Sequence, residues 1–294
     1  MKNKLMLVAA FALMFQACNS SGGNQTVLDQ ADETIAQSSN VPKASKIQLA
    51  KIKEYNEKNA LCGKDDMQQV NSYDGKLGQT QDFVKKFQSS VAAMEEKGAD
   101  SSSKYCSGTM ISEDLYLTAN HCVDGSVGQY LAFNYEKEKN STKLLKQEHF
   151  KITKIVEAGT GLDFAVLQIE GKPGAKYGFK KVKNELPAKD ALLTIIQHPS
   201  GNPKTVEVGH RGGFNAPYMG YGDIDTEPGS SGSGVIDKDG NVVGVHTNGG
   251  CGATSGENKG VAMNEIFKVS KVLPALAAKQ YIDSIELPPV PKKK

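Results

Sequence analysis

One glycine-rich turn carries a serine whose surroundings suit a nucleophile. The stretch Glu227-Pro-Gly-Ser-Ser-Gly-Ser-Gly234 places Ser231 in the order Gly-x-Ser-Gly. Glycines at 229 and 232 remove the Cβ atoms that would obstruct an incoming carbonyl, and they permit a turn in which the amides of Gly229 and Ser231 point at one spot. The motif predicts a nucleophile with its own oxyanion hole, although Gly/Ser runs more often form flexible turns.

A histidine and an aspartate elsewhere in the chain complete this chemistry. Thr118-Ala-Asn-His121-Cys122 follows an apolar strand, and Asp163 opens the largely apolar stretch 163–169. A serine hydroxyl needs an imidazole to take its proton, and the imidazole needs a carboxylate to fix its tautomer. An acid at the start of an apolar strand is costly to bury without a partner. We therefore expect His121, Asp163 and Ser231 to form a catalytic triad.

The elements that must position these residues read as strands. Short apolar runs at 164–169, 192–196 and 241–245 are separated by Gly, Asn and Asp turns, which is typical of antiparallel sheets. Residues 264–273 have helical spacing, and Pro274 is expected to interrupt this helix. The pattern predicts an all-β fold with a C-terminal helix.

The amino terminus predicts export. A short positive region is followed by the apolar residues 5–15 and by a lipobox-like sequence that ends at Cys18. This apolar stretch is too short to span a bilayer, so residues 1–17 are interpreted as a cleaved signal peptide. Lipidation of Cys18 would tether the protein to the cell envelope, and the alternative is an ordinary secretory signal with an incidental cysteine. Residues 18–60 are interpreted as a lipid-anchored tether or a propeptide.

Composition favours one exported folding unit. The 294 residues carry a net charge of +2, and the one basic run is Lys292–Lys294 in the Pro/Lys tail 286–294, so nothing points to nucleic acid. Residues 61–285 are expected to fold as one unit that needs no metal and no cofactor. Asp237-Lys-Asp-Gly240 is interpreted as a hairpin turn rather than a calcium loop.

Five cysteines leave an even set if Cys18 is lipidated. The remaining four suit an oxidising compartment, and their spacing lacks the close Cys-x-x-Cys or histidine pair of a zinc site. They are Cys62, Cys106, Cys122 and Cys251.

The three motifs together resemble those of the chymotrypsin-like serine peptidases. That family has its histidine in Thr-Ala-Ala-His-Cys, its aspartate in Asp-Ile-Ala-Leu and its serine in Gly-Asp-Ser-Gly-Gly, in the same order along the chain. The resemblance implies a double antiparallel β-barrel, with two six-stranded barrels at about 61–175 and 176–275 and the site in the cleft between them. It also implies a disulfide between Cys106 and Cys122, where the family has its histidine-loop bridge.

Within that family, residues from about 61 to 270 are most similar to bacterial glutamyl endopeptidases. Cys62-Gly-Lys-Asp-Asp-Met-Gln-Gln-Val70 resembles the start of the mature enzymes, with Met67 where arginine is usual. The segments around Thr226 and His246 resemble those that hold the substrate glutamate. The resemblance implies that Thr226 and His246 donate to that carboxylate and that Gly249 and Gly260 keep the pocket walls open. With Glu227 where trypsin has a cysteine, it also implies that Cys251 pairs with Cys62.

Two alternatives remain open. Asp225 lies six residues before Ser231, where trypsin carries the aspartate that binds lysine or arginine, so cleavage after basic residues is the rival specificity. The rival class is a non-catalytic, surface-anchored binding protein on a peptidase fold. Our interpretation is a monomeric exported serine endopeptidase that acts on polypeptides, preferably after Glu, and that is either lipid-anchored at Cys18 or released by processing near residue 60.

Overall fold

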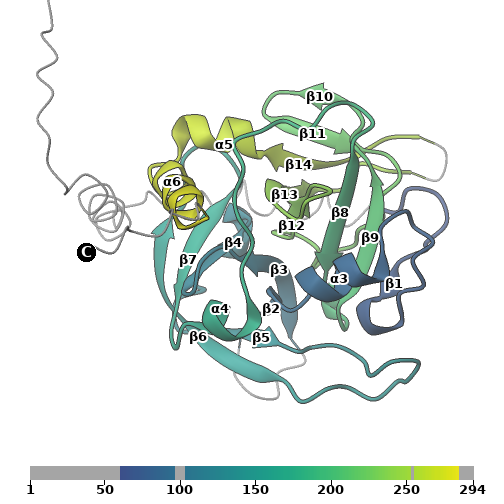
Figure 1. Cartoon of the computed structure of the whole chain (residues 1–294), viewed down its shortest axis with the longest axis horizontal. Helices are drawn as coiled ribbons and strands as arrows, with labels where there is room; N and C mark the ends of the chain where they lie inside the picture. The colour runs from purple at the N-terminus through teal and green to yellow at the C-terminus, as the bar shows by residue number, and fades with distance from the viewer. Residues whose placement is uncertain (1–59, 97–102, 253–254, 285–294) are drawn as a thin grey trace, which may run out of the picture.

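The computed structural model describes residues 60–96, 103–252 and 255–284, which form two antiparallel sheets with few helices (Figure 1). The predicted signal peptide, Cys18, the tether and the Pro/Lys tail lie outside the described residues. No helix in the described part of the chain is long and apolar enough to cross a membrane. The expected all-β fold is therefore confirmed for the part that the structure describes.

The first sheet closes on itself as a six-stranded barrel, in the order β2-β3-β4-β7-β6-β5. Its inward side chains, such as Leu117, Phe133 and Val166, are fully buried. β4 and β7 pair with Leu117 opposite Val166 and Thr118 opposite Ala165, so the ends of these two strands lie side by side. The strands are β2 (Val91–Glu95), β3 (Lys104–Met110), β4 (Leu115–Thr118), β5 (Tyr130–Phe133), β6 (Glu148–Glu157) and β7 (Ala165–Ile169).

The second sheet contains eight strands, in the order β1-β9-β8-β12-β13-β14-β11-β10. Its two edge strands, β1 and β10, have two residues each. The sheet thus has eight strands where six were expected, and β1 comes from the chain before the first barrel. The strands are β1 (Gln68–Gln69), β8 (Leu192–Gln197), β9 (Thr205–His210), β10 (Phe214–Asn215), β11 (Tyr218–Tyr221), β12 (Gly234–Ile236), β13 (Val242–Asn248) and β14 (Asn258–Ala262).

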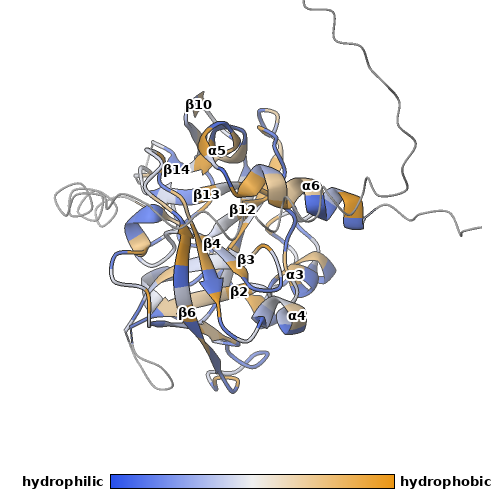
Figure 2. Ribbon diagram, turned by 90° about the vertical axis from the view of Figure 1, so that its left-hand side faces the viewer, coloured by the Kyte–Doolittle hydropathy of each residue, from blue (hydrophilic) through white to orange (hydrophobic). Residues whose placement is uncertain are grey.

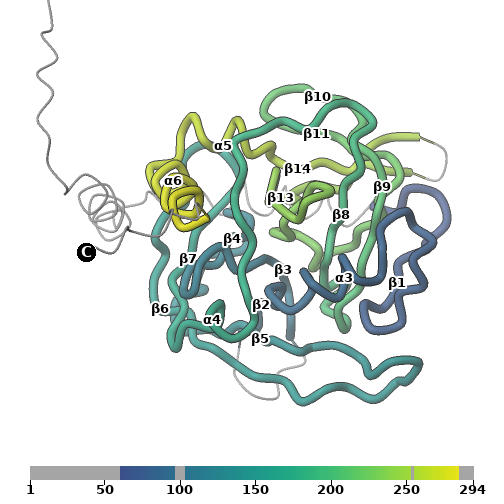
Figure 3. Tube along the Cα trace, in the orientation of Figure 1, coloured from purple at the N-terminus to yellow at the C-terminus, as the bar shows by residue number. Residues whose placement is uncertain are grey.

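The chain that precedes the first barrel lies on the second sheet. Gln68 pairs with Val206 of β9, and the tube in Figure 3 runs through β1 beside β9 before it enters the barrel. Residues near the start of the described chain are therefore neighbours of residues 205–225, although they are far apart in sequence.

Two of the four helices among the described residues connect the sheets, and the other two follow the last strand. α3 (Gln81–Phe87) precedes β2, α4 (Pro173–Tyr177) follows β7, and α5 (Met263–Val269) and α6 (Leu273–Asp283) follow β14. α6 packs on the first barrel, where Gln280 Nε2 donates to Ile111 O at 2.6 Å. Figure 2 shows hydrophobic and hydrophilic segments along both β6 and α6, as expected for elements with one buried side.

The predicted C-terminal helix is present but divided differently. α5 ends at Val269, and Ser270 has extended dihedral angles. Pro274 then lies in the first turn of α6 rather than ending a helix that begins at residue 264. Proline is well tolerated there because the first helical amides have no partner within the helix and φ is already suitable.

The described residues also contain three short 3-10 helices, Val70–Ser72 (η1), Asn120–Cys122 (η2) and Pro199–Gly201 (η3).

Candidate active site

His121 lies in the turn η2 directly after β4, and Asp163 lies just before β7. Because these strands pair, the two side chains meet: His121 Nδ1 is 2.8 Å from Asp163 Oδ2, and the His121 amide donates to Asp163 Oδ1 at 3.0 Å. Both side chains are 11% exposed. A carboxylate at Nδ1 favours the tautomer that carries its proton there, which leaves Nε2 free to accept a proton.

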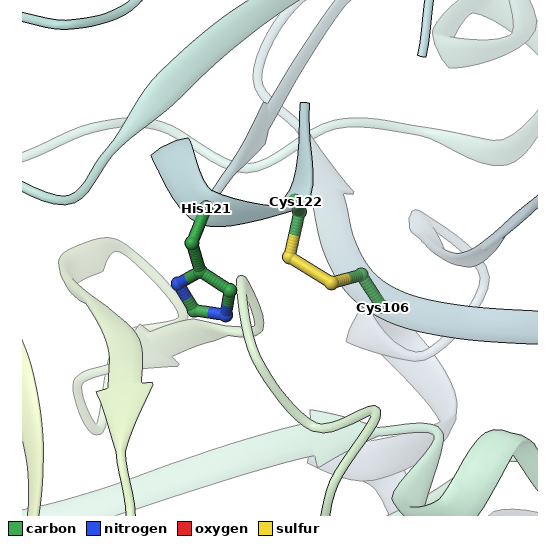
Figure 4. A group of neighbouring side chains, drawn as sticks. All are labelled: Cys106, His121 and Cys122. Atoms are coloured by element: carbon green, nitrogen blue, oxygen red, sulfur yellow. A yellow bond between two sulfur atoms is a disulfide. The ribbon is translucent and has the colours of Figure 1, made fainter. Parts of the chain in front are cut away.

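A disulfide fixes the other side of this turn. Cys122, the last residue of η2, is bonded to Cys106 on β3, as Figure 4 shows beside the imidazole. The predicted pairings Cys106–Cys122 and Cys62–Cys251 are both confirmed. The sulfur atoms near His121 are consumed by this bond, so the group Cys106, His121 and Cys122 offers no pair of thiolates to a metal.

The serine turn requires glycine at two positions. Gly229 has φ +95° and Gly232 has φ +88°, a backbone region that other residues rarely adopt. A Cβ on Gly229 would lie 2.8 Å from His198 O, and one on Gly232 would lie 2.1 Å from Thr118 Oγ1. Both positive φ angles and the close approach of β3 and β4 therefore explain the Gly-x-Ser-Gly order.

The amides of Gly229 and Ser231 are oriented by the carbonyls of Pro228 and Ser230, with which they share a peptide bond. Pro228 O accepts from Ser200 N at 2.5 Å, and Ser230 O accepts from Ser233 N at 3.1 Å. In a trans peptide the N–H points away from the C=O, so both amides are directed away from these anchors. Within the described residues neither amide donates to an acceptor. The two donors are thus available to an oxyanion.

Ser231 is held beside the histidine turn through its backbone. Its carbonyl accepts from Ser107 N at 2.9 Å and lies 3.8 Å from Cys122 Sγ. No hydrogen bond joins Ser231 Oγ to His121 Nε2 in the described structure, and catalytic hydrogen bonds of this kind commonly tighten when substrate binds. The fold therefore brings all three predicted residues to one place, with the His–Asp pair already formed.

His246, on β13, is buried and held neutral. Tyr221 OH lies 2.5 Å from His246 Nδ1. Burial, and secondarily the charge of His121, lowers the pKa of His246 to about 3, while burial raises the pKa of Tyr221 well above its usual value. Tyr221 therefore keeps its proton and donates it to Nδ1, which leaves the imidazole proton of His246 on Nε2.

Thr226 is a buried hydroxyl with nothing to bind. Its Oγ1 has no hydrogen-bond partner in the described structure, whereas its amide donates to Ala60 O at 3.0 Å. A buried hydroxyl without a partner is costly unless a ligand satisfies it.

The two predicted wall glycines have different surroundings. Gly260 lies opposite His246 in the sheet, where an added Cβ would approach Val245 O to 2.7 Å and Tyr221 OH to 3.3 Å. Gly249 is buried directly after β13.

The carboxylate of Asp225 is engaged by the start of the described chain. Its Oδ1 accepts from Cys62 N at 2.5 Å and its Oδ2 accepts from Asp66 N at 3.3 Å. The residue is only 2% exposed. This geometry orients Asp225 toward residues 62–66, the segment that resembles the start of the mature glutamyl endopeptidases.

Three residues that support the site were missed by the sequence analysis. Ser107 Oγ donates to Gly229 O at 2.8 Å and accepts from His198 N at 2.9 Å, so it ties β3 to the serine turn. Ser200 anchors Pro228, and Tyr221 fixes His246. Ser107 directly follows Cys106, whose predicted disulfide to Cys122 already indicated that it lies near His121. Nothing in the sequence marks Ser200 or Tyr221.

Comparisons with known proteins agree with this architecture. Residues 106–245 match the trypsin-like peptidase domain family. A secreted RxLR effector protein 73 of Plasmopara viticola is 25% identical over 223 residues, which is 67% of this chain and 53% of that protein. The chain thus spans about half the length of this curated relative.

Solved serine proteases resemble this chain at low identity, and those with TM-scores above 0.5 share its fold. A Glu endopeptidase in complex with MPD is 22% identical with a TM-score of 0.49, covering 65% of this chain and 91% of that one. A serine endoprotease from Yersinia pestis is 16% identical with a TM-score of 0.51, covering 67% and 66% of the two chains. Mouse neuropsin, a serine protease, is 14% identical with a TM-score of 0.51, covering 62% and 93%.

Proposed function

We propose that this chain, which carries a trypsin-like peptidase domain on the fold of the chymotrypsin-like serine peptidases, is an exported serine endopeptidase that cleaves polypeptides after glutamate. The observation that carries the proposal is the His121–Asp163 pair beside a serine turn, in which the amides of Gly229 and Ser231 have no acceptor among the described residues. A fold alone does not make an enzyme, so the argument rests on these groups.

The mechanism follows from their arrangement. Ser231 Oγ attacks the scissile carbonyl carbon while His121 Nε2 takes its proton, and Asp163 orients and stabilises the resulting imidazolium. The amides of Gly229 and Ser231 donate to the oxyanion. His121 then gives the proton to the departing amine, which leaves an acyl group on Ser231. Water, deprotonated by the same imidazole, attacks this ester, and the proton returns to Ser231 as the acid product departs.

Glutamate preference is supported by the polar groups of the second sheet. The substrate carboxylate would be bound by the Nε2–H of His246 and by Oγ1 of Thr226, which has no other partner among the described residues. The neutral histidine is a donor there because Tyr221 occupies its Nδ1. Charged hydrogen bonds of this kind replace the hydration that a carboxylate loses on entering a buried site.

The rival preference for lysine or arginine is disfavoured by Asp225. Its carboxylate accepts two backbone amides from residues 62–66 and is 2% exposed, so it is engaged away from an incoming basic side chain.

Export is the location we propose. Two disulfides in the described structure fit an oxidising compartment, and one matched relative is named a secreted effector. Lipidation of Cys18 and cleavage near residue 60 remain competing fates, because cleavage there would release the domain from its anchor.

The test compares cleavage of peptides that differ in one residue. The purified exported protein is given fluorogenic peptides with Glu, Asp, Lys, Arg or Leu before the scissile bond, with Ser231→Ala as the matched control. We expect cleavage after Glu that Ser231→Ala abolishes. Serine-dependent cleavage after Lys or Arg, removed by Asp225→Asn, would establish the rival specificity, and a folded protein that cleaves none of the peptides would favour the non-catalytic class.

A further inference from the structure

Three carboxylates from distant parts of the chain meet next to the segment that carries Thr226. Asp66 precedes β1, Glu207 lies on β9, and Asp225 follows β11. One carboxylate oxygen of each lies within 4.8 Å of one oxygen of both others. Asp66 is exposed, whereas Glu207 and Asp225 are 0% and 2% exposed.

Glu207 is buried in this cluster without any partner. Neither of its carboxylate oxygens has a hydrogen-bond partner among the described residues. In the described structure no lysine, arginine or histidine forms an ion pair with any of the three carboxylates. Buried carboxyl groups are ordinarily paired, bound to a metal or kept protonated, and the described residues bring no positive group to this cluster.

Gln197 carries another buried oxygen without a hydrogen-bond partner in the described structure. Gln197, on β8, is 0% exposed, and its Nε2 donates to Asp225 O at 2.8 Å. Its Oε1 has no partner in the described structure. The Nε2 contact places this side-chain amide next to Asp225, and an amide oxygen is a neutral ligand of the type that calcium takes in proteins.

We propose that Asp66, Glu207 and Asp225 form a Ca²⁺ site, with Gln197 Oε1 as a further ligand. The donor atoms are all oxygens, which suits a hard cation rather than zinc. The three carboxylate oxygens lie within 4.8 Å of one another, close enough for one cation to reach all of them. Ca²⁺ takes several carboxylates and amide oxygens in a flexible geometry, whereas Mg²⁺ usually keeps several waters and takes only one or two carboxylates.

The site joins the start of the described chain to the segment that carries Thr226. Asp225 also accepts the amides of Cys62 and Asp66, and Ala60 O accepts the amide of Thr226. The Cys62–Cys251 disulfide lies on the same segment. Bound Ca²⁺ would neutralise the cluster and stabilise these contacts together.

Calcium binding is tested on the exported protein carrying Ser231→Ala, which prevents self-digestion and makes the result independent of peptidase activity. Melting temperature is measured with EDTA and with about 10 mM CaCl₂, and affinity is measured by calorimetry. For a dissociation constant near 0.5 mM we expect a rise of about 5 °C. Magnesium at the same concentration should give a smaller rise.

Two substitutions remove ligands and one serves as a control. Glu207→Gln is expected to abolish the calcium-dependent shift, and Asp66→Asn, at an exposed position that does not endanger folding, should weaken binding at least tenfold. Asp82→Asn changes an exposed carboxylate on α3 and should leave the shift intact. The proposal is overturned if Ca²⁺ at 10 mM shifts the melting temperature of the Ser231→Ala protein by less than 1 °C, or if Asp66→Asn binds calcium as tightly as that protein does.

Discussion

Acidic side chains of the closed barrel and Glu207 of the second sheet differ in their ion-pair and hydrogen-bond partners. In the barrel, Glu95 is ion-paired with Lys104 and His149, Glu157 accepts from Ser270 Oγ and Lys271 N, and Asp163 accepts twice from His121. In the second sheet, both Glu207 oxygens and Thr226 Oγ1 have no partner among the described residues.

This contrast separates two tasks. The His121–Asp163 pair, to which we assign the catalytic role, is held by the protein alone, so its geometry exists before substrate arrives, as electrostatic preorganisation requires. The second sheet leaves buried oxygens whose cost falls only when a ligand satisfies them. We infer that Thr226 Oγ1 binds a substrate carboxylate and that the Glu207 carboxylate binds a cation.

Among substitutions in the barrel, Asp163→Asn should cause the largest loss of activity. An amide at 163 favours the wrong imidazole tautomer, so kcat should fall by about 10⁴-fold while the fold persists. Asp124→Asn, an exposed acid just after the histidine turn, is the control and should retain activity. The measurement is kcat from steady-state kinetics, and a decrease in kcat of less than tenfold for Asp163→Asn would contradict the role assigned to Asp163.

A smaller loss is expected where the two regions meet, in the serine turn. Gly229→Ala introduces a Cβ at φ +95° that would lie 2.8 Å from His198 O, so the turn must shift and displace its amide. We expect kcat to fall by about 10²- to 10³-fold.

Gly178→Ala is the matched control for this change. It has φ +76° and nothing within 4 Å of the added Cβ, so it carries a backbone cost without crowding. Equal kcat for the two variants would show that the turn does not supply an oxyanion donor.

His246→Ala tests the second sheet by specificity rather than by overall rate. Loss of a hydrogen bond to a charged group costs about 1.5 to 3 kcal/mol, so kcat/KM for Glu peptides should fall about 10- to 100-fold. Leu peptides should be affected much less. Tyr221→Phe keeps the ring but frees Nδ1, and it should give an intermediate loss; an unchanged Glu-to-Leu ratio in both variants would remove His246 from the pocket.

How much of this arrangement the sequence predicts depends on the range of the interactions. Each triad residue and the two turn glycines lie in short motifs that can be recognised on their own, whereas the disulfide pairings were implied by the family resemblance, since Cys62 and Cys251 are 189 positions apart. The Ser107, Ser200 and Tyr221 contacts join residues between 25 and 122 positions apart or cross between elements, and no local pattern encodes them. The cluster of Asp66, Glu207 and Asp225 could not be predicted for the same reason, because its members are far apart in sequence. The helix boundary at Pro274 was misplaced because proline both ends helices and begins them.

The smallest expected effect concerns stability in acid. The pKa of His246 is lowered to about 3 in the folded protein from 6.5, so below pH 6.5 the unfolded chain takes up a proton that the folded protein does not. The free energy of unfolding should therefore decrease as pH falls, by less than about 1 kcal/mol from this group between pH 7 and pH 6. Urea denaturation of His246→Gln should show a shallower dependence over pH 7 to 4; an identical slope would contradict the lowered pKa.

The central claim, that Ser231 is an activated nucleophile, is tested most directly by covalent labelling. The exported protein is treated with a fluorophosphonate and the modified peptide is identified by mass spectrometry. Stoichiometric labelling of Ser231, with His121→Ala labelled far more slowly, is the result we predict. A correctly disulfide-bonded and processed protein whose Ser231 remains unlabelled would contradict the account and favour a binding protein on a peptidase fold.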